Sequence, residues 1–210
     1  MLKIGLLSLS ALLFCVLLTN VCAAERITPK DALQRLMEGN GRFVKEKTLC
    51  PQRHQDRRTI TASKQRPFAI VLGCSDSRVP PELAFDQGIG DIFVVRVAGN
   101  VVGATELDSV DYSAIYNDSS IILVLGHGNC GAVSAVLANT TQDIETVADL
   151  IKPAMKPNQS LESAITANIK NSVTRIKQSP PIAKLIKAGK IEVVGGYYDL
   201  NTGEVKILSH

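Results

Sequence analysis

Residues 67–73 read PFAIVLG, an almost uninterrupted apolar run bounded by a proline and a glycine. Three further runs share this composition: DIFVVRVAG (91–99), SIILVLGHG (120–128) and KIEVVGGYY (190–198). Short apolar runs rich in β-branched residues are typical of parallel strands that are covered on both faces. The four runs therefore predict the strands of one buried sheet.

Helical patterns separate these runs and decide the fold class. The first, residues 29–47, has Thr28 as its N-cap and Pro29 in its first turn, and it predicts an N-terminal helical arm. Alternation of strands and helices predicts an α/β fold with a mostly parallel central sheet flanked by helices. The end of the chain, YYDLNTGEVKIL (197–208), predicts a C-terminal β-hairpin. The polar segment 49–65 is expected to be a loop with a short helix, and the remaining helices are expected at 103–117, 130–138, 146–155, 161–178 and 181–188.

The first 24 residues differ from the rest of the chain. An uncharged apolar run, residues 4–18, follows Lys3, and the small residues Ala23 and Ala24 fit a signal-peptidase site. The run is shorter than the roughly 20 residues that a membrane span needs, although a retained anchor is the alternative. We therefore predict a signal peptide at 1–24, a single domain at 25–210, and export to a bacterial periplasm without stable membrane association after cleavage.

The charge and the cysteine content limit the classes of function that the chain can have. The chain of 210 residues has a net charge of +3 and no tryptophan, which argues against a nucleic-acid-binding surface. Beyond the signal segment three cysteines remain, Cys50, Cys74 and Cys130. An odd number cannot pair completely in disulfides. Either one thiol is free, or some of the thiols hold a metal.

Metal-ligating residues follow two of the predicted strands. Cys74 comes directly after the first strand, and His127 and Cys130 come at the end of the third. In open α/β sheets, the residues that bind ligands lie at the carboxyl ends of the strands. Two thiolates and one imidazole are the ligands of a catalytic zinc site with an open fourth position, which Asp76 could fill. We therefore predict one Zn²⁺ per chain and, at an open position, a water molecule with a pKa of about 7.

Three other interpretations of these residues stay open. Cys74 and Cys130 could form a disulfide, which would leave His127 unexplained. The zinc could be purely structural, with Asp76 as a permanent fourth ligand. GHGNCG (126–131) matches the G-x-G-x-x-G pattern of dinucleotide sites, but it follows the third strand, and the acidic residues Asp143 and Glu145 come too early after it.

Three segments of the chain, taken in their order, resemble the motifs of a known protein family. CSDSR (74–78), RVAGN (96–100) and HGNCGAV (127–133) resemble the β-class carbonic anhydrases, and the similarity runs from about Pro29 to the C-terminal hairpin. The resemblance implies a zinc lyase that interconverts carbon dioxide and bicarbonate by means of a zinc-bound hydroxide.

The resemblance also implies roles for individual residues. Zinc would be held by Cys74, His127 and Cys130, beside an ion pair of Asp76 and Arg78. While Arg78 holds Asp76, the fourth ligand would be water or hydroxide. When the pair breaks, Asp76 would bind zinc and close the site.

A substrate pocket at a dimer interface is a further implication of the resemblance. The chain would form a homodimer or a dimer of dimers, and Gln65 and Tyr112 would act on the partner's zinc. The pocket residues that match by motif are Gln65, Phe93, Ala98, Tyr112 and Gly128.

The sequence departs from the family pattern at one position, and two alternative functions stay open. Some members have a tryptophan three residues before the first cysteine, at a bicarbonate regulatory site, where this chain has Val71. We therefore expect an open resting site. A carbonyl sulfide or carbon disulfide hydrolase with the same ligands is one alternative function. A non-catalytic zinc or redox protein is the other.

Overall fold

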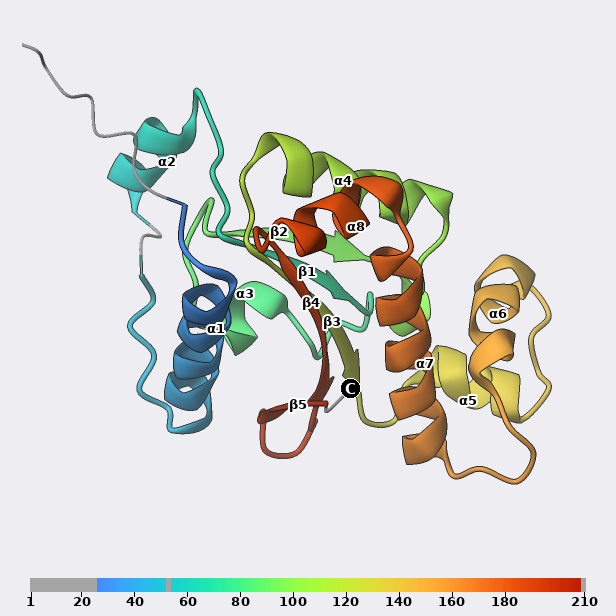
Figure 1. Cartoon of the computed structure of the whole chain (residues 1–210). Helices are drawn as coiled ribbons and strands as arrows, with labels where there is room; N and C mark the ends of the chain where they lie inside the picture. The colour runs from blue at the N-terminus through green and yellow to red at the C-terminus, as the bar shows by residue number, and fades with distance from the viewer. Residues whose placement is uncertain (1–25, 52–53, 209–210) are drawn as a thin grey trace, which may run out of the picture.

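The structure, a computed structural model, describes residues 26–51 and 54–208 (Figure 1). The predicted signal peptide lies outside the described residues. The predicted α/β fold is confirmed by a five-stranded sheet of order β2-β1-β3-β4-β5, in which the first four strands are parallel and β5 is antiparallel to β4. The strands are β1 (Ala69–Gly73), β2 (Ile92–Arg96), β3 (Ile121–His127), β4 (Glu192–Tyr198) and β5 (Val205–Ile207).

Helices connect the strands and cover both faces of the sheet. The predicted N-cap of the first helix is confirmed, because the Thr28 hydroxyl accepts a hydrogen bond from the Asp31 amide. One helix, the four-residue α3, is not predicted by the sequence pattern, because it is too short to show a period. The helices are α1 (Pro29–Val44), α2 (Gln55–Thr61), α3 (Pro81–Ala84), α4 (Ala104–Tyr116), α5 (Gly131–Leu137), α6 (Glu145–Ile151), α7 (Leu161–Lys177) and α8 (Pro180–Lys187), with 3₁₀ turns η1 (Ala98–Asn100) and η2 (Lys152–Ala154).

The core lies in two layers because successive side chains of a strand point to opposite faces. Ile70 and Leu72 of β1 pack with α4 to α8, whereas Ala69 and Val71 pack with α1 and α3. Figure 1 shows the same division, with α1 and α3 on one side of the sheet and α7 on the other. Both faces of β1 and β3 are therefore buried, as their apolar runs predict.

β2 differs from the predicted buried strand. Its residues are half-buried or exposed, whereas all residues of β1 and β3 are buried. The reason is its place in the sheet: β2 is an edge strand, and among the described residues only β1 pairs with it. Its outer backbone groups are thus available for pairing with another chain.

Two glycines of α1 offer a matched test of how this helix packs. A Cβ at Gly39 would lie 1.8 Å from the Phe85 carbonyl oxygen, whereas a Cβ at Gly41 would meet nothing within 4 Å. We expect Gly39→Ala to lower the free energy of unfolding by about 1–3 kcal/mol or more through overpacking. Gly41→Ala should raise it by about 0.5–1 kcal/mol. Urea denaturation measures both, and equal effects would contradict the close packing at Gly39.

Among residues 26–51 and 54–208, none of the helices has the length and hydropathy needed to cross a bilayer.

Candidate metal centre

The register of the two central strands brings three donor side chains together. β1 and β3 are parallel neighbours with Gly73 opposite Leu125, so Cys74 and His127 lie at the same edge of the sheet. Cys130 follows on the short loop that leads into α5 and is its N-cap residue. The donor atoms of Cys74, His127 and Cys130 all lie within 4.8 Å of one another. All three residues are buried, with exposures of 6%, 0% and 1%.

The His127 ring is oriented for a metal. Its Nδ1 lies 2.8 Å from the Gly128 carbonyl oxygen. Since a carbonyl can only accept, Nδ1 carries the proton and Nε2 keeps a free lone pair. Nε2 is buried and makes no hydrogen bond in the described part of the chain. A buried nitrogen without a partner costs about 1–3 kcal/mol unless something else binds it. The site therefore fits a cation.

The two thiols of the site compete for one proton. Cys74 and Cys130 are free thiols in the structure, not the disulfide that the sequence leaves open. A hydrogen bond from Cys130 lowers the pKa of Cys74, and contacts with His127 and the Gly99 amide lower it further against the effect of burial. The pKa of Cys130 is raised, first by its hydrogen bond with Cys74 and then by burial. A thiolate that forms this readily is a good ligand for a divalent cation, which displaces the remaining protons.

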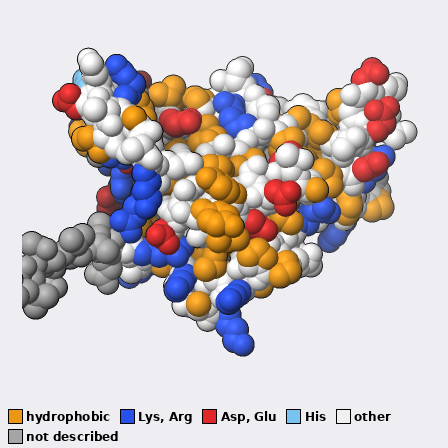
Figure 2. Space-filling view, turned by 90° about the horizontal axis from the view of Figure 1, so that it is seen from above, with side chains coloured by type: hydrophobic (Ala, Val, Ile, Leu, Met, Phe, Trp, Pro, Cys, Tyr) orange, Lys and Arg blue, Asp and Glu red, His pale blue; other side chains and the backbone are white. Residues whose placement is uncertain are grey.

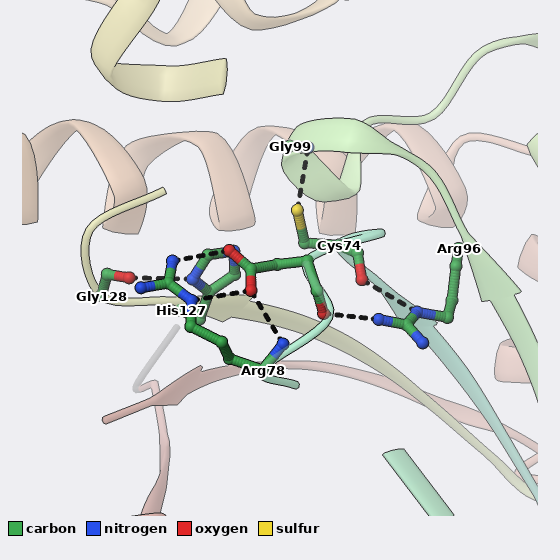
Figure 3. A network of polar contacts seen from close by, with 7 residues as sticks. Cys74, Arg78, Arg96, Gly99, His127 and Gly128 are labelled. Carbon is green, nitrogen blue, oxygen red and sulfur yellow. Dashed lines mark hydrogen bonds and ion pairs between the residues drawn. The ribbon is translucent and has the colours of Figure 1, made fainter. Parts of the chain in front are cut away.

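Asp76 and Arg78 form the predicted ion pair beside these ligands (Figure 3). Arg78 donates to Asp76 Oδ1 from Nε at 2.9 Å and to Oδ2 from Nη2 at 2.7 Å, and its backbone amide donates to Oδ1 at 3.0 Å. These hydrogen bonds hold the pKa of Asp76 well below its usual range, with His127 contributing. Asp76 Oδ2 lies 3.7 Å from His127 Nε2, so the carboxylate borders the donor cluster.

Arg96, at the end of β2, holds the segment that carries both Cys74 and Asp76. Its Nε donates to the Cys74 carbonyl at 3.0 Å, and its Nη2 donates to the Asp76 carbonyl at 2.6 Å (Figure 3). No role for Arg96 is predicted from the sequence. The available signal is an arginine at the carboxyl end of an otherwise apolar strand, because that end lies beside the ligands of the neighbouring strand.

The predicted pocket residues fall into two groups. Ala98 and Gly128 lie beside the donor cluster, since they adjoin Gly99 and His127 in the chain. Gln65 and Tyr112 instead line a separate cavity of about 470 Å³.

Phe93 belongs to this second group, because its ring centroid lies 6.3 Å from that of Tyr112. None of the three residues of the donor cluster lines that cavity. The described part of one chain thus does not bring Gln65 and Tyr112 to its own donor cluster.

Packing accounts for glycines of the G-x-G-x-x-G match. A Cβ at Gly126 would lie 2.5 Å from Ile169 of α7, and a Cβ at Gly128 would lie 3.0 Å from the Tyr197 hydroxyl oxygen. A larger residue at Gly126 would therefore force Ile169 to move, and one at Gly128 would press against the Tyr197 hydroxyl.

Comparisons with known proteins agree with this arrangement. The family model for carbonic anhydrase matches residues 69–205. A carbonic anhydrase of Mycolicibacterium smegmatis is 37% identical over 194 residues, covering 87% of this chain and 94% of the relative. Among solved structures, the β-carbonic anhydrase CcaA covers 84% of this chain and 95% of its own, with a TM-score of 0.67 and 25% identity.

A tetrameric β-carbonic anhydrase of Sordaria macrospora shares the fold, with a TM-score of 0.64 and 22% identity over 86% of this chain and 98% of its own. The family match spans the segments that carry Cys74, Asp76, Arg78, His127 and Cys130. The chain therefore belongs to the β-carbonic anhydrase family.

Proposed function

We propose that this chain is a zinc enzyme that hydrates carbon dioxide reversibly to bicarbonate and a proton. The buried cluster of Cys74, His127 and Cys130 carries the proposal, together with the finding that His127 Nε2 has no hydrogen-bond partner among the described residues. Two thiolates and one imidazole are a donor set that zinc prefers, with a fourth position left for chemistry. Zinc supplies, when bound, a Lewis acid that brings the pKa of a water molecule down to about 7, the value known for carbonic anhydrases.

Asp76 and Arg78 would decide whether that fourth position is open. The Arg78 guanidinium holds both carboxylate oxygens of Asp76, and a bidentate pair fixes direction as well as distance. In this orientation Asp76 can accept a hydrogen bond from a reacting molecule and so orient it. Released from Arg78, the same carboxylate has only a short way to move before it reaches the donor cluster, because Oδ2 already lies 3.7 Å from His127 Nε2.

The test is stopped-flow carbon dioxide hydration together with a count of bound zinc. We expect one zinc per chain and rapid hydration between about pH 7 and 9, where a zinc-activated water is ionised. One zinc per chain without hydration in that range contradicts the proposal. Turnover of carbonyl sulfide or carbon disulfide by the same preparation favours the hydrolase alternative, and a protein without zinc that cycles between thiol and disulfide favours the redox alternative.

We further propose that a second copy of the chain completes the substrate pocket. Two features of the described residues support it: the outer edge of β2 is unpaired, and α4 beside it exposes Tyr112, Ile115 and Tyr116. Figure 2, which looks down on the side where α4 lies, shows apolar side chains gathered in the middle of this face. A partner placed on β2 and α4 would cover this face and bring its own Gln65 and Tyr112 toward the first chain's donor cluster.

Mixing two inactive variants tests this arrangement. One chain carries Cys74→Ala, which removes a ligand, and the other carries Tyr112→Ala. If Tyr112 acts on the partner, the mixed dimer regains one complete site, and its activity per dimer should be about half that of the wild-type dimer. If Tyr112 acts within its own chain, the mixture gains no activity over the separate variants. Purification through two different affinity tags isolates the mixed dimer, and mass determination checks its composition.

A further inference from the structure

Two polar side chains interrupt the apolar face of α7. Asn168 and Ser172 are each 1% exposed and lie among buried residues such as Ile165, Ile169 and Val173. They are four residues apart, so they share one face of the helix. Both reach the same 3₁₀ turn, η1: the Asn168 Nδ2 donates to the Gly99 carbonyl at 2.7 Å, and the Ser172 hydroxyl donates to the Asn100 carbonyl at 2.9 Å.

The turn that they hold carries a direct contact to the donor cluster. The Gly99 amide donates to the Cys74 sulfur at 3.3 Å (Figure 3). Gly99 has φ +70°, and Asn100 has φ +45°. A Cβ at Gly99 would lie 3.0 Å from Ile151 Cδ1 and 3.3 Å from Ala132 Cβ, and at this φ any side chain would also strain the backbone. Glycine leaves the backbone free to rotate, and the direction of this amide therefore depends on contacts that fix the turn from outside.

The side-chain amide of Asn168 is only partly satisfied. Its Oδ1 is buried without a hydrogen-bond partner in the described part of the chain. The unpaired Oδ1 reduces what this amide contributes to stability, although an apolar residue here would leave the Gly99 carbonyl without its donor. Asn168 does provide one short hydrogen bond to the Gly99 carbonyl, and the N–H of Gly99 faces the Cys74 sulfur.

We propose that Asn168 is a positioning residue for the metal site: with Ser172 it fixes η1 so that the Gly99 amide points at the Cys74 sulfur. The inference rests on the proposed zinc function. A hydrogen bond to a ligating thiolate fixes its orientation and withdraws charge from it, which tunes both metal retention and the acidity that the metal confers. Loss of such an outer contact typically costs about 10–100-fold in metal affinity or activity.

A matched pair of variants on α7 tests the proposal. Asn168→Leu keeps the number and branching of the side-chain heavy atoms and removes the donor. Asn171→Ala is the control, because Asn171 lies on the same helix and also donates to a carbonyl, that of Leu150 at 3.2 Å, but that carbonyl belongs to α6. Two readouts are independent of turnover: the rate of zinc transfer to a chelator, and the thiolate-to-cobalt charge-transfer band of the cobalt-substituted protein. Circular dichroism of each variant checks the fold.

We expect Asn168→Leu to release zinc about 10–100-fold faster than wild type and to shift the charge-transfer band, while Asn171→Ala matches wild type in both. If both variants release zinc at the wild-type rate, or accelerate it equally, the positioning role is wrong. If Asn168→Leu does not fold, Asn168→Ser, which keeps a shorter hydroxyl donor, decides by the same readouts. A wild-type protein that binds no zinc overturns the proposed function as well, so the two failures are distinguishable.

Discussion

Cys74→Ala is expected to give a folded protein that retains no zinc and hydrates carbon dioxide no faster than the uncatalysed reaction. Cys74 is one of three donors, and its removal leaves one thiol and one imidazole, too few to hold zinc against a chelator. The fold should persist, because deleting one buried atom of this size costs about 1 kcal/mol. Zinc analysis after dialysis and stopped-flow hydration measure the two losses.

The chain provides its own control for this variant. Cys50 is an exposed thiol outside the donor cluster, and its sulfur lies 3.7 Å from the Thr48 hydroxyl. Cys50→Ala should therefore keep one zinc per chain and full activity. Zinc and activity that survive in Cys74→Ala would show that the cluster is not the metal site. Equal losses in both variants would point to a general effect of removing a thiol.

Arg78→Ala is expected to lower kcat/KM by about 100-fold while zinc stays bound. Arg78 provides the guanidinium that holds Asp76 in a bidentate pair, and half of its side chain is exposed, so the fold loses little. Without that pair, Asp76 is free to turn toward the donor cluster and occupy the fourth position. Arg78→Lys should recover only part of the activity, because an ammonium keeps the charge but cannot form the two parallel hydrogen bonds.

The cobalt-substituted protein distinguishes this closure from a simple loss of charge. If Asp76 occupies the fourth position in Arg78→Ala, the visible spectrum changes, and the additional substitution Asp76→Asn reverses part of that change. Lys152→Ala is the matched control. Lys152 forms an exposed ion pair with Asp149, with 2.8 Å between Nζ and Oδ1, and neither residue belongs to the donor cluster. If Arg78→Ala keeps wild-type kcat/KM, Arg78 does not control the site.

The sequence predicts the central strands well because their burial leaves a plain local pattern. Five consecutive buried residues in β1 and seven in β3 require apolar runs, and such runs are visible without any structure. β2 has a similar run, but its half-burial depends on its place at the edge of the sheet. Strand order is set by long-range pairing, which no window of sequence contains.

The same distinction applies to the site. The donors Cys74, His127 and Cys130 are predictable because the end of a strand is a local feature and each residue type has few chemical uses. The residues that position these donors are not predictable from the sequence. Arg96 and Asn168 donate hydrogen bonds to backbone carbonyls of other segments, and every residue type has such a carbonyl. The separation of Tyr112 from the donor cluster likewise depends on where α4 lies.

The parallel pairing of β1 and β3 has a thermodynamic consequence. The donors come from segments that are distant in the chain and meet only when these strands pair, so the unfolded chain offers no comparable site. A ligand that binds only the folded state stabilises it by mass action, by about 4 kcal/mol at a free concentration 1,000 times its Kd. The melting temperature of this protein would then follow the free zinc level around it, and its resistance to heat would be set partly by its surroundings.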